Sequence, residues 1–170
     1  ARDWRRTGRF DHRNGTGVTG SPRDTPGPVI EYRRLEAPVA LPDDVLCAVT
    51  FGARSESVDD PRCVRVGLEP LAGGGLVEVW HASGRVHRGY DGLVRYTHDE
   101  HHLAAAIEID ESRYGGIAAA AQVAYAAMAS FQAAVQFPQV LRVWNYFDAI
   151  NEGDGDGERY RQFCVGRTAG

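Results

Sequence analysis

The sequence has 170 residues, of which 43% are hydrophobic and 25% charged, with a formal net charge of -4. This mixture is typical of a soluble globular protein, and the length suits one domain with a tail. The acidic balance argues against a nucleic-acid binder, which usually carries a basic stripe. Because no run approaches the ~20 apolar residues of a membrane span, we expect neither nucleic acid nor a membrane as partner.

Residues 1–28 predict a flexible N-terminal tail. They are rich in Gly, Pro, Arg and Asp and have almost no apolar periodicity, so they bury too little surface to offset their ordering entropy. The predicted folded domain covers residues 29–170.

Short apolar or alternating runs, bounded by Gly, Pro or Asp, follow from Val29 and predict strands. In the last of them, Ala104–Ala106 is the weaker part, whereas residues 107–110 alternate cleanly. The expected strands are Val29–Leu35, Val45–Phe51, Cys63–Leu68, Leu76–His81, Leu93–Tyr96 and Leu103–Ile109.

A long alanine-rich segment, Gly116–Gln136, predicts a helix that ends before Pro138. We expect Gln139–Phe147 to form a buried strand, and Glu158–Val165 to form a second, short helix. Several strands, a helix, a strand and a helix predict an α+β fold, with helices packed on one face of a mixed sheet.

Two acidic or histidine-rich clusters resemble metal sites but depart from the known patterns. Residues 98–102 read HDEHH, but they fall between two predicted strands, where positions i and i+4 do not converge, so a solvated turn is favoured. Asp154–Glu158 resembles the start of a calcium loop, whose sixth and twelfth positions would be Arg159 and Val165 instead of Gly and Glu. We predict no metal site.

The three cysteines are odd in number and lack C-x-x-C spacing, which argues against a disulfide framework or a zinc ribbon. Reduced thiols, and an N-terminus without the apolar stretch of a secretory signal, fit an expected cytoplasmic location. Cys164 has no histidine near it in sequence, so we interpret it as a small buried hydrophobic residue instead of a nucleophile.

Arginine and amide side chains near the C-terminus are candidates for ligand binding. Arg159, Arg161 and Arg167 either form an anion cradle or lie on a solvated helix face paired with Asp154, Asp156 and Glu158. Asn145 and Tyr146, at the end of the predicted strand, either orient a ligand hydroxyl or serve as a turn cap and a packed ring. The residue types alone leave both pairs of alternatives open.

The stretch from Gln139 to Arg167, QVLRVWNYFDAINEGDGDGERYRQFCVGR, resembles the middle of the chorismatases, in which WNY is followed by IN, a polar loop and YR-x-FC-x-GR. Val77–Ala82 is similar to the EVWHA strand of that family, and Leu41–Leu46 to the entry segment of some members. The resemblance extends from about Val29 to Gly170. It is to the N-terminal half of a chorismatase of the 3-hydroxybenzoate synthase type.

This resemblance implies a RidA/YjgF-like fold, in which two helices back one face of a mixed sheet. Such domains assemble as trimers or fused copies, with ligand sites in clefts between units. Arg167 occupies a position similar to that of an arginine that holds a substrate carboxylate there. Since chorismate is a dicarboxylate and a guanidinium grips a carboxylate with two parallel hydrogen bonds, the predicted substrate-binding residues are Arg167, Arg161, Asn145 and Tyr146.

The activity implied by the resemblance is removal of the enolpyruvyl group of chorismate as pyruvate. The ring product would be a dihydroxycyclohexadiene carboxylate or a hydroxybenzoate, and no metal or other cofactor is expected. In the family an acidic proton donor lies in a second, related domain beyond the GR motif, so no catalytic residue is assigned here. The alternative is a non-catalytic RidA-like half-domain that works with a second domain or as a homo-oligomer.

Overall fold

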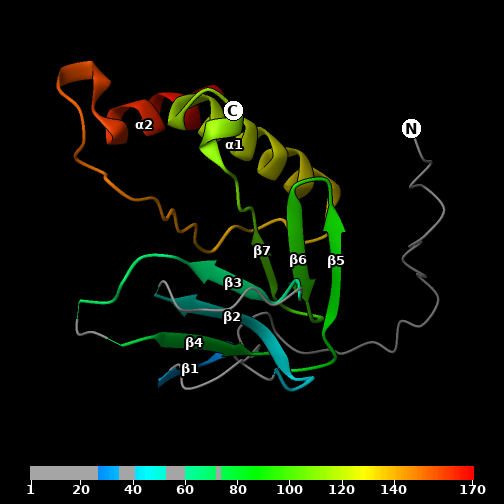
Figure 1. Cartoon of the computed structure of the whole chain (residues 1–170). Coiled ribbons are helices and arrows are strands. Elements are labelled where there is room, and N and C mark those ends of the chain that lie inside the picture. Colours follow the sequence, from blue (N-terminus) through cyan, green and yellow to red (C-terminus); the bar gives the residue numbers. More distant parts are fainter. Residues whose placement is uncertain (1–26, 35–40, 53–59, 72–73) are drawn as a thin grey trace.

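The computed structural model describes residues 27–34, 41–52, 60–71 and 74–170, and within them a strand-rich part precedes two helices (Figure 1). Residues 1–26, nearly all of the predicted tail, lie outside the described residues. The α+β class is confirmed. The elements are β1 (Val29–Arg34), β2 (Val45–Phe51), β3 (Cys63–Val66), β4 (Leu76–His81), β5 (His87–Asp91), β6 (Val94–His98), β7 (Leu103–Ala106), α1 (Ile117–Ala134) and α2 (Arg159–Ala169), with short 3-10 turns at Glu111–Arg113 (η2) and Gly155–Gly157 (η3).

The strands form two sheets. In the first, with the order β1-β4-β2-β3, β4 runs antiparallel to both β1 and β2, whereas β2 and β3 are parallel. The second is the antiparallel meander β5-β6-β7. Both helices lie together in a layer beside the strands (Figure 1). The expected mixed sheet is therefore present, but in two parts.

A bulge in β2 connects the two sheets. Val45 pairs with His81 and Cys47 with Trp80, so Leu46 is an extra residue in β2 that has no partner in β4. The carbonyl of Leu46 accepts a hydrogen bond of 2.5 Å from the hydroxyl of Thr97 on β6. Thr97 is 1% exposed, so this bond satisfies a buried hydroxyl that would otherwise be costly.

The core of the first sheet lies on one face of its central strands. Val45 and Ala48 of β2 pack with Val77 and Val79 of β4, all of them buried, and Leu41 covers the cluster from the side. Because side chains alternate across a strand, Glu78 and Trp80 of β4 project from the opposite face. That second face is the one on which the functional site is built.

The two helices are packed closely enough that their backbones touch. A Cβ atom on Gly166 of α2 would lie 2.0 Å from the carbonyl oxygen of Ala118 on α1, so only glycine permits this approach. Phe131 of α1 then contacts Tyr96 of β6, with ring centroids 5.1 Å apart. The helix pair is thus anchored to the second sheet.

Among the described residues, α1 is long and apolar enough to cross a membrane by length and composition alone, and 17% of it is buried. Its close packing on α2 and its contact with β6 are those of a helix within an α+β domain. The absence of a membrane partner stays a prediction.

The expected strand at Gln139–Phe147 is wrong. In the structure this segment belongs to no strand or helix, and it makes no backbone–backbone hydrogen bond within the described residues. Its apolar residues are not buried either: Val140 is 56% and Leu141 81% exposed. The reason is that the segment runs between the helix layer and the first sheet, beyond hydrogen-bonding reach of a strand edge.

Two further expectations about strands need correction. β7 covers Leu103–Ala106, which includes the weaker alanines, and stops before the alternating residues 107–110, because its pairing with β6 ends where Arg95 faces Ala106. β5 was not predicted at all, since its sequence HRGYD carries little apolar signal. The Asp91–Gly92 dipeptide that joins it to β6 is the turn signal that indicates a hairpin here.

The HDEHH segment forms the turn between β6 and β7, but its Asp99 is buried instead of solvated. Asp99 is 2% exposed, and its carboxylate accepts hydrogen bonds from the amides of Ser83, His101 and His102 and from the Ser83 hydroxyl. Burial alone would raise the pKa of Asp99, yet these hydrogen bonds hold it below its usual value. The carboxylate therefore fixes the turn.

We expect Gly166→Ala to lower the free energy of unfolding by about 1–3 kcal/mol, although alanine favours helices by about 1 kcal/mol. The clash of the new Cβ with the Ala118 carbonyl is the cause. Gly67→Ala is the matched control, because nothing lies within 4 Å of a Cβ there. Urea denaturation measures both, and equal stability of the two variants would contradict the close helix contact.

We expect Asp99→Asn to destabilise the protein at pH 7 by about 2–3 kcal/mol, since an amide cannot accept all four hydrogen bonds. Because the pKa of Asp99 is lowered in the folded state, its contribution is complete above the ordinary value of 3.8 and disappears as the pH falls through the folded-state value. The stability difference between wild type and variant should therefore shrink below pH 4. A difference that stayed constant from pH 7 to pH 3 would disprove this role.

Candidate functional site

The outer face of β4 carries a glutamate between aromatic rings. The indole Nε1 of Trp80 donates a hydrogen bond of 2.6 Å to Glu78 Oε1. Tyr32 lies opposite Glu78 in the β1–β4 pairing, and the negative charge of Glu78 raises the pKa of this tyrosine. A charged carboxylate is thus held in an aromatic setting at the surface of the sheet.

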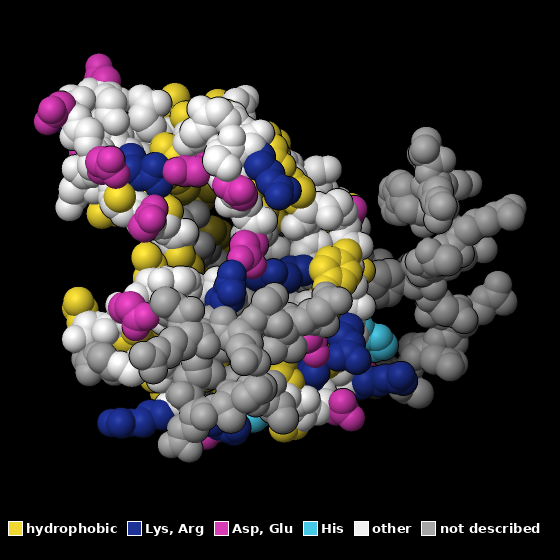
Figure 2. Space-filling model, in the orientation of Figure 1, with side chains coloured by type: hydrophobic (Ala, Val, Ile, Leu, Met, Phe, Trp, Pro, Cys, Tyr) yellow, Lys and Arg dark blue, Asp and Glu magenta, His cyan; other side chains and the backbone are white. Residues whose placement is uncertain are grey.

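Two rings of the WNY segment cover this face. The Trp144 ring stands edge-on to Trp80, with centroids 5.7 Å apart, and the Tyr146 ring stands edge-on to Phe51 of β2, also at 5.7 Å. Both geometries are those that aromatic pairs prefer. We call the set Tyr32, Phe51, Glu78, Trp80, Trp144 and Tyr146 the aromatic face. Figure 2 shows hydrophobic side chains lining the hollow between the helices and the strands.

Asn145 and Phe147, which alternate with these rings along the segment, point the opposite way, toward the helices. Asn145 Oδ1 accepts a hydrogen bond of 3.0 Å from the Tyr125 hydroxyl of α1, and Phe147 stacks on Phe163 of α2 at 4.8 Å. The segment therefore alternates in the manner of a strand, with rings down onto the sheet and Asn145 and Phe147 up onto the helices. Side-chain contacts, instead of backbone hydrogen bonds to a neighbouring strand, hold the segment in position.

Tyr146 is the predicted site residue that the aromatic face contains. Partial burial raises the pKa of Tyr146, and the nearby charge of Glu78 and the neighbouring Tyr32 act in the same direction. Its phenol therefore stays protonated near neutral pH and can donate a hydrogen bond. Asn145 keeps its amide group as a donor, because the bond from Tyr125 occupies only its oxygen.

The predicted arginines lie on α2 and do not converge. Arg161 pairs with Asp156 and Glu158, each at 3.3 Å, which is the solvated-face alternative. Arg159 pairs with Glu111 at 2.8 Å and with Asp148 at 3.3 Å. Arg167 is exposed near the end of α2, and its guanidinium makes no ion pair or hydrogen bond to the part of the chain that the structure describes.

Across the described ranges, no hydrogen bond, ion pair or ring contact joins Arg161 or Arg167 to Asn145 or Tyr146. The assignment of these four residues to one substrate site therefore stays a prediction. Of the two arginines, Arg167 has the uncommitted guanidinium. Sequence reasoning also left out Glu78 and Tyr32, although Glu78, a charged residue within an otherwise apolar strand, was a signal for an exposed functional face.

The described residues form no metal centre, and two of the three cysteines do not provide a reactive thiol. The described residues contain no group of three or more His, Cys, Asp or Glu side chains that could hold a metal ion. Burial raises the pKa of Cys47 to about 12 and raises that of Cys63 above its usual value. These two thiols therefore do not supply a thiolate nucleophile near neutral pH.

We expect Phe147→Ala to loosen the segment that carries Trp144 and Tyr146, because the Phe147–Phe163 stack is its attachment to α2. Amide hydrogen exchange of residues 139–150 should accelerate at least severalfold, while exchange in β2 and β4 stays unchanged. Phe137→Ala is the matched control, since that ring contacts His98 instead. Equal exchange in wild type and Phe147→Ala would show that the segment is held elsewhere.

Three comparisons place the chain among known proteins. A family model described as "Chorismatase FkbO/Hyg5-like, N-terminal" matches residues 78–170, a range that begins at Glu78 and includes the WNY segment. A chorismatase from Streptomyces hygroscopicus is 35% identical over 94 residues, which are 55% of this chain and 27% of that protein. A 3-hydroxybenzoate synthase from the same organism is 30% identical over 101 residues, 59% of this chain and 28% of that protein.

A solved structure is similar over more of the chain. The crystal structure of a chorismatase superposes with a TM-score of 0.70 at 27% identity, covering 84% of this chain and 44% of the other. The RidA-like fold expected from the sequence is thereby confirmed. The chain spans less than half of that structure and little more than a quarter of the curated relatives that it matches.

Proposed function

We infer the function of this chain from its family: it belongs to the FkbO/Hyg5-like chorismatases and carries their N-terminal region. We propose that it forms the N-terminal part of a site that cleaves chorismate into pyruvate and a ring product, either a dihydroxycyclohexadiene carboxylate or a hydroxybenzoate. The observation that carries the proposal is the family match over residues 78–170, which include four of the six residues of the aromatic face, together with the relatives named chorismatase and 3-hydroxybenzoate synthase.

The aromatic face suits a flat cyclic substrate. Its rings offer apolar surface to the cyclohexadiene ring, while the Tyr146 hydroxyl and the Asn145 amide are donors for ring oxygens. The substrate also has two carboxylates, and Arg167 is the uncommitted cation for one of them. In this proposal, the positively charged side chain that binds the carboxylate is Arg167, which reaches the substrate from α2 of the same chain or from a neighbouring unit.

The chemistry requires a proton donor and water. An acid protonates the methylene carbon of the enol ether, water adds to the resulting oxocarbenium carbon, and the hemiketal collapses to pyruvate and the dihydroxycyclohexadiene carboxylate, which gives a hydroxybenzoate when it loses water. We assign no residue of this chain as the acid. A second domain or a second copy of the chain would supply it.

A specific observation favours a second candidate function, a non-catalytic half-domain. Several large apolar side chains in and near α2 and in the 139–147 segment are exposed, including Leu141 at 81% and Val165 at 60%. Surface of this kind marks an interaction site. In this alternative the chain contributes structure to an assembly whose chemistry takes place elsewhere.

The test is to incubate the 170-residue chain with chorismate and to follow pyruvate by a coupled assay, with chorismate binding measured by calorimetry. We expect Arg167→Ala to weaken binding by about 1.5–3 kcal/mol. The matched control is Arg113→Ala, an arginine whose side chain is 80% exposed and which pairs with Asp110; its affinity should not change.

Pyruvate release above the spontaneous rate would support a working site within this chain or its oligomer. Chorismate binding without release would indicate a half-site that lacks its acid. Absence of binding would leave the half-domain alternative. Unchanged affinity in a folded Arg167→Ala variant would remove that residue from the site.

A further inference from the structure

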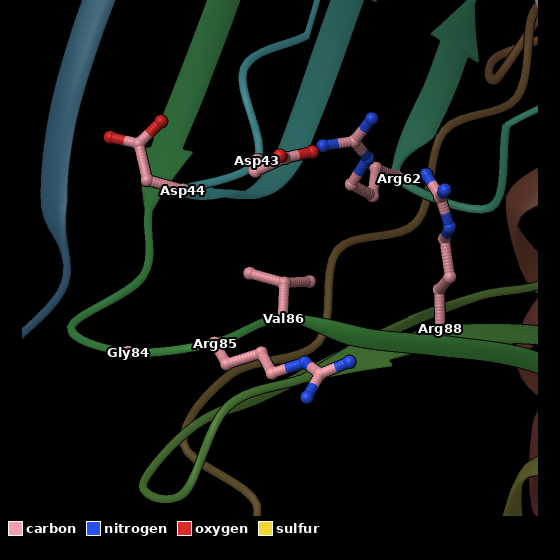
Figure 3. Close-up of a pocket in the computed structure, with 7 residues that line it drawn as sticks. All are labelled: Asp43, Asp44, Arg62, Gly84, Arg85, Val86 and Arg88. Atoms are coloured by element: carbon pink, nitrogen blue, oxygen red, sulfur yellow. The ribbon is translucent and has the colours of Figure 1, made fainter.

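A cavity with charged walls lies apart from the aromatic face. It is about 460 Å³ in volume, which is within the range of small-molecule sites. It lies between the turns that precede β2 and β3 and the chain that enters β5 (Figure 3). Its lining consists of Asp43, Asp44, Arg62, Gly84, Arg85, Val86 and Arg88.

Arg62 forms a fixed positive wall of this cavity. It is 6% exposed, its Nε and Nη2 atoms donate to the Asp60 carboxylate, and Nη1 donates to the Pro42 carbonyl at 2.7 Å. A further bond of 3.4 Å runs from Nη2 to the Leu41 carbonyl. Most of its donors are committed, so Arg62 contributes charge and rigidity instead of direct contacts.

Arg88 and Arg85 have guanidinium N–H groups that make no hydrogen bond within the described residues. Arg88 Nη1 donates to Asp60 Oδ2 at 3.2 Å, the same oxygen that Arg62 contacts, and Figure 3 shows its side chain reaching toward Arg62. Its other N–H groups make no hydrogen bond with the residues that the structure describes, so they can bind a ligand. Arg85 makes no ion pair or hydrogen bond with the described residues. One carboxylate, Asp60, therefore faces two guanidiniums, and a third lies nearby.

The two lining aspartates do not cancel this charge. Asp44 contacts His81 Nδ1 at 3.2 Å, and in Figure 3 its carboxylate points away from the cavity. Asp43 lies beside Arg62 (Figure 3). The hydrogen bonds that Arg62 donates to Asp60 and, to a smaller extent, the charge of Asp43 raise the pKa of Arg62. Within the described residues Arg85 has no ion-pair partner, and Arg88 shares the single negative charge of Asp60 with Arg62.

We propose that this cavity is a binding site for a small anion bearing carboxylate or phosphate groups, gripped by Arg85 and Arg88. Guanidiniums bind both groups through parallel charge-assisted hydrogen bonds. The charged lining suits a small polar anion better than an apolar ligand. The site is separate from the aromatic face, and the inference does not depend on chorismate cleavage.

The experiment is calorimetric titration of the 170-residue chain with pyrophosphate and with malonate, and with malonamide as the uncharged analogue. We expect saturable binding of at least one anion at one site, weaker at high salt, and no binding of malonamide. The anion that binds distinguishes a phosphate site from a carboxylate site. Arg85→Gln and Arg88→Gln should each weaken binding about tenfold or more, whereas Arg113→Gln, the matched exposed arginine, should not.

Three outcomes would overturn the proposal: no saturable binding of either anion, equal binding of malonamide, or unchanged binding in the Arg85→Gln/Arg88→Gln double variant. Circular dichroism melting checks that each variant is folded. Should Arg88→Gln unfold through loss of its contact with Asp60, Arg85→Gln alone decides the question, because Arg85 makes no contact of this kind with the described residues.

Discussion

The hydrogen bond from Thr97 to the Leu46 carbonyl is the connection on which the arrangement of the strands depends. It joins β6 to β2 at a bulge, and both residues are buried. The turn between β6 and β7, which Asp99 fixes through its hydrogen bonds, depends on the position of β6. Since α1 rests on β6 through Phe131 and Tyr96, the position of the helix layer above the first sheet follows from the same contact.

The sequence was sufficient to predict most elements, and the exceptions have physical causes. β2 and β4 have the predicted bounds because apolar alternation is strong where one face is buried. β5 was missed because its sequence HRGYD carries little apolar signal. Its Gly89 packs beneath the ring of Tyr96, where a Cβ would lie 2.7 Å from the phenol oxygen. That contact between strands is invisible to a local pattern. The 139–147 segment shows the converse error, since strand-like alternation does not reveal whether a neighbouring strand exists to pair with.

For the candidate site, too, the sequence indicates residue types but does not reveal where their side chains lie. Tyr146 and Asn145 could be selected from sequence, and the structure explains them as two sides of one extended segment, facing the sheet and the helices. Residue types alone could not rank the arginines, because pairing depends on which carboxylates lie near, and only the family resemblance favoured Arg167. Arg161 is held by Asp156 and Glu158, whereas Arg167 is uncommitted within the described residues. Glu78 shows that a strand assigned to the core can present a carboxylate on its other face.

The side-chain attachment of the 139–147 segment has an evolutionary consequence. A strand in a ladder must keep its register, because a shift of one residue moves every side chain to the other face. Here, within the described residues, register is set by where the rings of Trp144, Tyr146 and Phe147 find their neighbours and by the hydrogen bond from Tyr125 to Asn145. Homologous chains should therefore tolerate wide variation at the flanking positions, and even insertions before Trp144, as long as the spacing of these four side chains is preserved. Selection on this segment acts on four consecutive anchor residues and leaves the backbone before them free to vary.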